Sequence, residues 1–226
     1  MKIAVLGTGV VGQTLAARLD DLGHEVTVGT RDPAATLART ESDGVGNPPY
    51  SEWARAHAGV SLSTFAEAAA GAELIVNATS GVASIAALVE ADAANLAGKV
   101  LLDVSNPLDF AGGFPPSLFV KDTDSLGEQI QAAFPHAKVV KSLNTLTVAL
   151  MVQPRELAEG EHSVFVSGND DDAKGVVVDL LQSFGHTDVI DLGDITTARG
   201  SEMILPLWVR LLTAFGTPKF NFKVVR

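Results

Sequence analysis

The first 32 residues constrain the fold most, because an apolar run leads directly into closely spaced glycines. Residues 3–6 are apolar, and residues 7–12 follow with the glycine spacing GxGxxG. A segment with helical periodicity covers 12–22, and a second apolar run covers 25–28. A strand, a glycine turn, a helix and a second strand in this order are typical of a unit that binds a dinucleotide.

Each of the three glycines has a separate expected role. Gly7 permits the tight turn, Gly9 lets backbone amides approach a pyrophosphate, and Gly12 allows the helix to pack closely on the sheet. The pyrophosphate would then lie at the positive N-terminus of the helix. A tight strand-to-helix turn without any ligand is the alternative that the spacing leaves open.

Apolar runs and helical segments alternate through the first two thirds of the chain. Most of the runs are continuous, as in strands that are buried on both faces. The expected strands are 3–6, 25–28, 74–78, 100–104 and 138–142, and the expected helices are 12–22, 34–40, 64–70, 85–91 and 125–133. This alternation predicts an α/β protein with a Rossmann-type, doubly wound, mostly parallel sheet.

The pattern changes after residue 144. The elements expected there are strands over 163–167 and 188–192, a helix over 171–184, a helix over 148–157 interrupted by Pro154, and a helix over 196–215 bent by Pro206. We therefore predict a dinucleotide-binding domain over 1–144 and a smaller C-terminal lobe over 145–226. Two stretches rich in glycine and proline, 42–58 and 109–116, are expected as loops. The loop over 42–58 could cover the dinucleotide site.

Composition excludes several classes of function. The chain has 16 Lys and Arg and a net charge of −11, so we expect no nucleic acid partner. It has no Cys, and its five His show no metal-ligand spacing, so we expect no metal site. Residues 1–6 enter a strand directly and no apolar run approaches the roughly 18 residues of a membrane span, so we expect no signal peptide, no membrane partner and a cytoplasmic location.

The end of the second predicted strand indicates which dinucleotide binds. An NAD site commonly has Asp or Glu there, whereas this chain has Gly29-Thr30-Arg31. A hydroxyl and a guanidinium would bind the 2′-phosphate of NADP by charge-assisted hydrogen bonds. Asp32 is the counter-signal, but it could instead cap a helix that begins at Pro33. We therefore predict NADP(H).

Polar clusters follow three of the predicted strands, at the edge where ligands bind in such sheets. They cover 77–81, 103–107 and 141–145. Their hydroxyl and amide groups would contact the nicotinamide, its ribose or a substrate, although each could also be a helix cap or a turn. No arrangement for acid–base catalysis stands out, which is compatible with hydride transfer between two redox cofactors.

Several of these motifs together resemble the NADPH-dependent reductases of the deazaflavin coenzyme F420. Similar sequences also occur in the cytoplasmic oxidoreductase domain of membrane metalloreductases. The resemblance is carried by 2–12, 22–26, 29–32, 77–79, 103–107, 139–145, 192–194 and 198–203, and it covers most of the chain. It implies that Thr30 and Arg31 hold the 2′-phosphate. It also implies that Thr8, Val10 and Val11 line the pyrophosphate turn.

The resemblance further implies a second redox ring beside the nicotinamide. Ser80, Asn106, Pro107 and Asn144 would approach one of the two rings. The closing helix, with Met203, Leu207 and Trp208, would wall the pocket or form a homodimer contact, with plain core packing as the alternative. The full set of expected cofactor-binding residues is Gly7, Thr8, Gly9, Val10, Val11, Gly12, Thr30, Arg31, Thr79, Ser80, Asn106, Pro107 and Asn144.

The sequence thus predicts an oxidoreductase that transfers hydride between NADP(H) and a deazaflavin (F420) or flavin-like acceptor. One alternative is a sensor module that binds NADPH without catalysis. Another is a dehydrogenase of a small carbonyl or imine substrate, which would need a positioned proton donor. Lys141 is the only obvious candidate for that donor.

Overall fold

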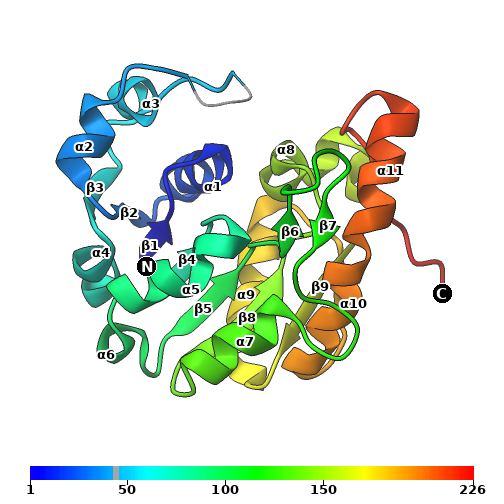
Figure 1. The fold of residues 1–226 in the computed structure, drawn as a ribbon. Helices are drawn as coiled ribbons and strands as arrows, with labels where there is room; N and C mark the ends of the chain where they lie inside the picture. The colour runs from blue at the N-terminus through cyan, green and yellow to red at the C-terminus, as the bar shows by residue number, and fades with distance from the viewer. Residues whose placement is uncertain (43–45) are drawn as a thin grey trace.

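The computed structural model describes residues 1–42 and 46–226. One eight-stranded sheet runs through the described chain in the order β10-β9-β8-β5-β4-β1-β2-β3. Figure 1 shows this sheet from β3 at one edge to β9 near the other. All neighbouring strands are parallel except β8 and β9. The strands are β1 (Lys2–Leu6), β2 (Glu25–Thr30), β3 (Ser61–Thr64), β4 (Leu74–Asn77), β5 (Val100–Asp103), β8 (Lys138–Ser142), β9 (Ser163–Gly168) and β10 (Asp188–Asp191). The predicted α/β fold with a mostly parallel sheet is confirmed.

Several strand assignments differ from the sequence prediction. The strand expected over 25–28 continues to Thr30, and β3 was not predicted at all. Strand β3 is short, three of its four residues are Ser or Thr, and it pairs only with β2 at the edge of the sheet. It therefore lacks the continuous apolar run by which a doubly buried strand is found. A small hairpin of β6 (Leu108–Asp109) and β7 (Ser117–Leu118) also flanks the loop predicted over 109–116.

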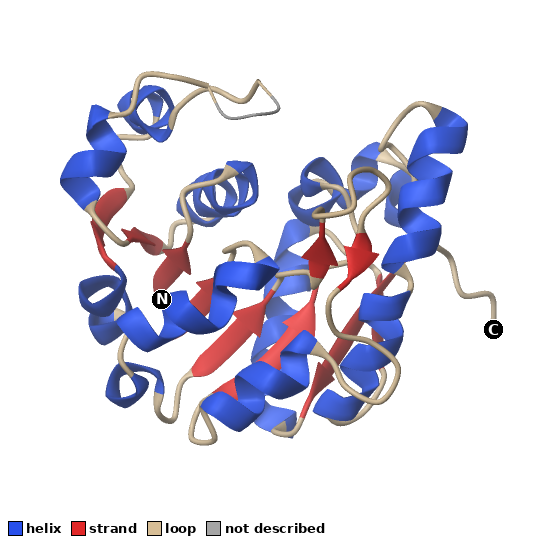
Figure 2. Ribbon diagram, viewed as in Figure 1, coloured by secondary structure: helices blue, strands red, loops and turns tan. Residues whose placement is uncertain are grey.

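Helices cover both faces of the sheet, as Figure 2 shows. Side chains of β1 alternate between the two faces, so that Ile3 and Val5 join one buried cluster and Ala4 and Leu6 the other. The first cluster packs under α1 (Val10–Asp21), α3 (Tyr50–Ala56), α8 (Val148–Val152) and α9 (Asp171–Phe184), and the second under α4 (Phe65–Gly71), α5 (Gly81–Glu90), α6 (Ala93–Leu96), α7 (Leu126–Ala133) and α10 (Ala198–Met203).

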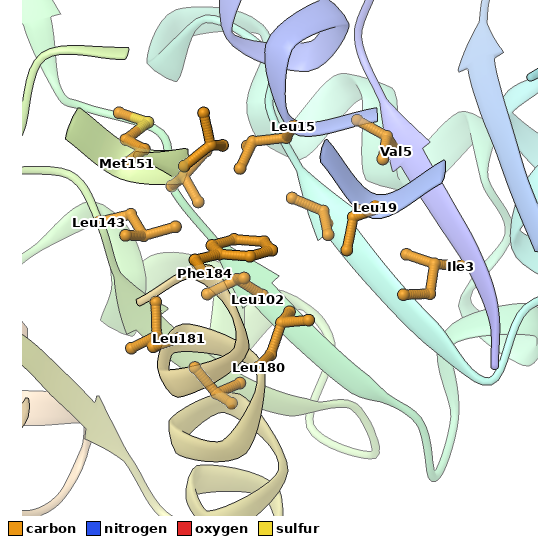
Figure 3. Close-up of a cluster of buried hydrophobic side chains, with 14 of the residues drawn as sticks. Ile3, Val5, Leu15, Leu19, Leu102, Leu143, Met151, Leu180, Leu181 and Phe184 are labelled. Atoms are coloured by element: carbon orange, nitrogen blue, oxygen red, sulfur yellow. The ribbon is translucent and has the colours of Figure 1, made fainter. Parts of the chain in front are cut away.

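The first cluster joins α1, near the start of the chain, to α9, in its last third. Figure 3 shows Leu15 and Leu19 of α1 on the same buried surface as Leu180 and Phe184 of α9. Each of these side chains is at most 4% exposed. Residues 145–226 therefore share one sheet and one core with the first 144 residues, and the predicted division at residue 144 stays a prediction.

The remaining helices follow the predicted proline positions. Helix α8 ends before Pro154, where a 3-10 turn (Pro154–Glu156) begins. The helix predicted over 196–215 is present as a 3-10 turn (Ile195–Thr197), α10 and α11 (Leu205–Phe215), with the last boundary just before Pro206. Helices α2 (Pro33–Ala38) and α3 lie in the connection between β2 and β3. Residues 43–45 of the loop predicted over 42–58 lie outside the described residues.

The order of the strands fixes where a ligand can bind. From β1 the chain continues to β2 on one side, whereas β4 pairs with β1 on the other side. Helices that follow these strands lie on opposite faces, which opens a crevice at the carboxyl ends of β1 and β4. The glycine turn and the polar clusters after β4 and β5 meet at this crevice.

Candidate functional site

The glycine turn between β1 and α1 has two glycines that the protein itself requires. Gly7 has φ of +121°, and a Cβ there would lie 2.7 Å from the carbonyl oxygen of Ala78. A Cβ on Gly12 would lie 2.1 Å from the carbonyl oxygen of Gly7. Gly9 is different, because a Cβ there would meet nothing within 4 Å. Packing within the protein therefore does not require glycine at position 9, whereas a ligand close to the backbone would.

The N-terminus of α1 offers backbone N–H groups to such a ligand. Its cap residue is Gly9, so there is no side-chain cap, and the first turn has no acidic residue. Helices α4, α7 and α9, by contrast, begin with side-chain caps from Thr64, Ser125 and Asp170. The first N–H groups of a helix lack partners inside the helix and attract anions. Open space at Gly9 together with this uncapped helix fits the pyrophosphate of a dinucleotide.

A cavity of about 520 Å³ adjoins one side of the glycine turn, and we refer to it as the α2–α3 cavity. Its described walls come from the turn, the end of α2 and the segment that leads into α3. They are Thr8, Gly9, Val10, Gln13, Thr36, Ala38, Arg39, Thr40, Glu41, Ser42, Asn47, Pro48, Pro49 and Tyr50. Ser42 and residues 47–50, from the loop predicted over 42–58, thus line one side of the candidate site.

A second cavity of about 250 Å³, the α5 cavity, lies at the carboxyl ends of β4 and β5. It is lined by Val11, Ala78, Thr79, Ser80, Gly81, Val82, Val104, Ser105, Asn106, Leu108 and Phe110. The structure therefore brings together four predicted site residues, Val11, Thr79, Ser80 and Asn106. None of the described side chains on these walls is ionisable, and Ser80 begins α5 without a side-chain cap bond.

Thr30 and Arg31 point to different surroundings, because successive residues of an extended segment face opposite ways. The Thr30 hydroxyl is buried and lies 2.9 Å from the hydroxyl of Thr36. Arg31 is exposed, and its Nε lies 3.0 Å from Oε1 of Glu90. Asp32 accepts a hydrogen bond of 2.9 Å from the backbone N–H of Ala35, so its predicted role as a helix cap is confirmed.

Thr36, Arg39 and Tyr50 line the α2–α3 cavity and were not among the predicted site residues. Arg39 donates from Nη2 to the Thr36 hydroxyl at 3.3 Å. Tyr50 is 5% exposed, and burial raises the pKa of its hydroxyl to about 12. That hydroxyl has no hydrogen-bond partner in the described part of the chain. No motif surrounds these residues, so only the folded arrangement identifies them.

Asn106 and Asn144 hold each other at the edge of the α5 cavity. Asn106 donates to the carbonyl oxygen of Asn144 at 3.0 Å, and Asn144 donates back to Oδ1 of Asn106 at 3.2 Å. Asn144 is 3% exposed and is not among the cavity walls, so in this structure it orients Asn106. Pro107 accepts a backbone hydrogen bond from Phe119 and so helps to anchor the β6–β7 hairpin.

Lys141 does not face either cavity, which removes it as a proton donor. Its side chain is fully buried, and Nζ lies 2.8 Å from Asp103, 3.0 Å from Glu202 and 2.6 Å from the carbonyl oxygen of Ser105. Burial lowers the pKa of Lys141, but the carboxylates of Asp103 and Glu202 outweigh burial and raise it above its usual range. The sequence could not show this, because both carboxylates are distant along the chain.

The network around Lys141 shapes the loop that carries Asn106. Asp103 also accepts hydrogen bonds from Asn77 at 2.8 Å and from the Ser105 hydroxyl at 2.7 Å. Glu202 accepts from the first two backbone N–H groups of α7 at 2.8 and 3.0 Å. A buried ion network thus connects α10 and α7 to the strand ends that line the α5 cavity.

The closing helices present apolar side chains to the surface. Met203 is 39% exposed and Leu207 is 52% exposed, so the alternative of plain core packing does not hold for them. The ring of Trp208 packs against Phe220 with centroids 5.1 Å apart. None of the three lines the two cavities, and their predicted role as a pocket wall or dimer contact stays a prediction.

Residues 1–42 and 46–226 contain no group of three or more His, Cys, Asp or Glu that could hold a metal ion. They also contain no helix with the length and apolar character needed to cross a membrane.

Comparison with known proteins identifies similar sequences and structures. A family model described as NADP oxidoreductase, coenzyme F420-dependent, matches residues 2–107. The chain is 30% identical to metalloreductase STEAP3 of Rattus norvegicus over 95% of its own length, but it spans only 39% of that protein. It is 28% identical to the F420-dependent NADP reductase of Methanothermobacter marburgensis, over 93% of this chain and 92% of the relative.

The crystal structure of a candidate F420-dependent NADP reductase from Arthrobacter sp. FB24 is similar to this chain, with 64% sequence identity and a TM-score of 0.95. The match covers 100% of both chains.

Proposed function

The chain belongs to the family of coenzyme F420-dependent NADP oxidoreductases, and from this premise we propose that it transfers hydride between NADP(H) and a deazaflavin (F420) or flavin-like acceptor. Family membership makes it an NADP-dependent oxidoreductase. The observation that carries the choice of acceptor is the α5 cavity, whose described walls combine apolar, hydroxyl and amide groups with no ionisable side chain.

The proposed cofactor site uses the features of the glycine turn. Gly9 and the uncapped start of α1 would hold the pyrophosphate, and Thr30 and Arg31 would contribute to the 2′-phosphate site. Bound NADPH supplies a hydride, which is one proton with two electrons, and becomes NADP⁺. The residues of this chain then have to orient two ligands and exclude water.

The α5 cavity suits that task. Thr79, Ser80 and Asn106 offer hydrogen-bonding groups, and the mutual bonds of Asn106 and Asn144 fix one of these side chains in place. Phe110 lines the same cavity and is 59% exposed, so its ring is available to pack against a flat acceptor. The aromatic surface favours a ring-shaped acceptor over a small aliphatic one.

The dehydrogenase alternative is weakened by the position of Lys141. Reduction of a carbonyl or imine usually needs a positioned proton donor, and the one side chain considered for that role is fully buried in an ion network. A deazaflavin or flavin that accepts hydride within a cavity without ionisable walls does not depend on such a donor.

Steady-state oxidation of NADPH against F420, free flavins and ferric chelates tests the proposal. We expect turnover with F420 or a flavin, and none in a Gly9→Val variant. Because a Cβ at Gly9 meets nothing within 4 Å, that variant should fold and fail only in binding. Tight NADPH binding without oxidation by any acceptor would instead support the sensor alternative.

We also propose a homodimer as the state of the protein in solution. Leu207 and Phe215 on α11 are 52% and 58% exposed, and a second copy that covered them would bury this apolar surface. Analytical ultracentrifugation of the wild type and of Leu207→Glu tests this, since the substitution should shift the protein toward monomer.

A further inference from the structure

Glu202 is a buried carboxylate of α10 that binds two other elements of the protein. It is 1% exposed, and its Oε1 lies 3.0 Å from Nζ of Lys141 on β8. It also accepts hydrogen bonds of 2.8 and 3.0 Å from the backbone N–H groups of Leu126 and Gly127, the first two residues of α7. One side chain of α10 therefore holds both Lys141 and the start of α7 in place.

Two connections lead from α10 to the walls of the α5 cavity. Lys141 donates to the carbonyl oxygen of Ser105 at 2.6 Å, and Ser105 lines the cavity. Asn144 donates to the carbonyl oxygen of Ser201 at 3.1 Å and to Oδ1 of Asn106 at 3.2 Å. Consecutive residues of α10 thus hold consecutive residues of the cavity wall, through one intermediate side chain each.

The start of α7 reaches the same cavity by packing. Gly81, on the cavity wall at the start of α5, lies so close to the next loop that a Cβ there would be 1.9 Å from the carbonyl oxygen of Asn106. The same Cβ would be 3.1 Å from Cδ2 of Leu126. Close-packed interiors transmit small displacements, so a shift of α7 or of the loop would move the start of α5.

Stability alone does not account for a network of buried charges here. The side chains of Lys141, Asp103 and Glu202 are each at most 2% exposed. Taking charged groups out of water is costly, and apolar side chains of similar size often stabilise a protein as much or more. What such a network can supply instead is a single defined arrangement, in this protein the placement of the lysine on the carbonyl oxygen of Ser105.

We propose that Glu202 is a positioning residue for hydride transfer. Through Lys141 and the start of α7, it holds the walls of the α5 cavity in the arrangement that orients the acceptor ring against the nicotinamide. This inference rests on the proposed function, since it requires the acceptor to bind in the α5 cavity. A displaced wall would change the orientation of the acceptor, and the rate of the chemical step depends steeply on orientation. The glycine turn is held by β1 and α1 instead, so the affinity for NADPH should not change.

Glu202→Gln tests the proposal, because it keeps the size of the side chain and removes its charge. The matched control is Glu128→Gln, since Glu128 also joins α7 to α10, through Nε of Arg199 at 2.8 Å, with side chains 15% and 35% exposed. With F420 or riboflavin as the acceptor, kcat should fall about 10-fold in the test variant and less than about twofold in the control. The dissociation constant of NADPH, measured by calorimetry, should stay within about twofold in both.

A neutral triple variant separates positioning from stability. Lys141→Met/Asp103→Asn/Glu202→Gln carries none of the three charges, so it should be more stable than Lys141→Met. The carbonyl oxygen of Ser105 still lacks its donor in the triple variant, so kcat should stay as low as in Glu202→Gln. Each variant is assayed at a temperature where circular dichroism shows it to be folded. Recovery of kcat together with stability would show that the network is only structural and would contradict the positioning role.

Hydrogen exchange in the free protein provides a readout that needs no acceptor. The N–H of Ser105 donates to Asp103 at 3.2 Å. The N–H of Leu108 donates to the carbonyl oxygen of Asn106 at 2.9 Å, so both N–H groups report on the cavity wall. Relative to the N–H groups of β1, both should exchange at least about fivefold faster in the test variant and at an unchanged rate in the control variant. Unchanged exchange in the test variant would overturn the inference whatever the acceptor.

The outcomes separate this inference from the proposed function. If the wild type oxidises NADPH with F420 or riboflavin and Glu202→Gln keeps kcat within about twofold, the role of Glu202 is wrong and the proposed function stands. If the wild type binds NADPH but transfers hydride to neither acceptor, the proposed function fails, and this inference fails with it.

Discussion

Replacing Lys141 with Met should unbalance the most deeply buried charges in the described part of the protein. Lys141 and Asp103 have side chains with no exposure, and that of Glu202 is 2% exposed. Removing the lysine leaves two carboxylates inside the protein without a positive partner. Breaking a buried ion pair in this way destabilises a protein by about 3–5 kcal/mol.

The size of the loss in the free energy of unfolding depends on the hydrogen bonds that the two carboxylates keep. Asp103 keeps its bonds from Asn77 and Ser105, and Glu202 keeps two backbone N–H donors at the start of α7. These donors stabilise the charged forms, so we expect a loss nearer to about 3 than to 5 kcal/mol. The Ser105 carbonyl also loses its donor, so the loop before Asn106 should shift and weaken turnover.

Urea unfolding followed by circular dichroism measures the change in the free energy of unfolding. Lys138→Met is the matched control, because Lys138 lies in the same strand and pairs with Asp170 at 2.9 Å with both side chains about a third exposed. The control should lose far less stability, because an ion pair between exposed side chains contributes little. Neutralising the carboxylates as well, in Lys141→Met/Asp103→Asn/Glu202→Gln, should recover part of the loss. If Lys141→Met were no less stable than Lys138→Met, the interpretation of this network as a coupled set of buried charges would be refuted.

Three further predictions concern pH, cofactor affinity and the acceptor. Burial lowers the pKa of His186 from 6.5 to about 4. The contribution of His186 to the free energy of unfolding is therefore complete above about pH 6.5 and should fall by about 3 kcal/mol as the pH drops to 4. Urea unfolding at pH 7.5 and 4.5 measures this fall, and a His186→Gln variant should lose this dependence on pH. Glu90→Gln should free Arg31 from its ion pair and tighten NADPH binding about two- to fivefold in calorimetry, with the affinity for NADH unchanged. Weaker NADPH binding would show that Glu90 instead holds Arg31 in its active position. Phe110→Ala should raise KM for the acceptor by about 10-fold, with the dissociation constant of NADPH unchanged. An equal effect on both ligands would show that Phe110 does not contact the acceptor alone.

Sequence patterns predicted the parts of the fold that depend on near neighbours along the chain. The glycine turn, the continuous apolar strands and the Asp32 cap each involve residues a few positions apart, so periodicity and spacing reveal them. Strand β3 was missed because an edge strand with three Ser or Thr residues has no apolar signature. Local pattern therefore predicts an element when burial determines its composition.

The residues of the candidate site also divide into those that the sequence predicted and those that it did not. Thr79, Ser80 and Asn106 were predicted because each follows a strand, and parallel strands bring their carboxyl ends together. Val11 was predicted as part of the glycine turn. Lys141 was misinterpreted because its carboxylate partners lie 38 and 61 residues away and arrive only with tertiary packing. A polar residue at a strand end can serve the ligand or the scaffold, and its burial decides between the two.

The α2–α3 cavity and the α5 cavity lie on either side of the glycine turn, so different residues would determine nucleotide binding and acceptor binding in the proposed reaction. Nucleotide binding would depend on the glycine turn and the end of β2, whereas acceptor binding would depend on α5 and the β6–β7 hairpin. These segments come from opposite sides of the point where the strand order reverses, so each can change without repacking the other. The ion network under Asn106 belongs to the acceptor side alone, since its members lie on β5, β8 and α10. Substitutions at Lys141 should therefore alter acceptor turnover at an unchanged ratio of NADPH to NADH affinity.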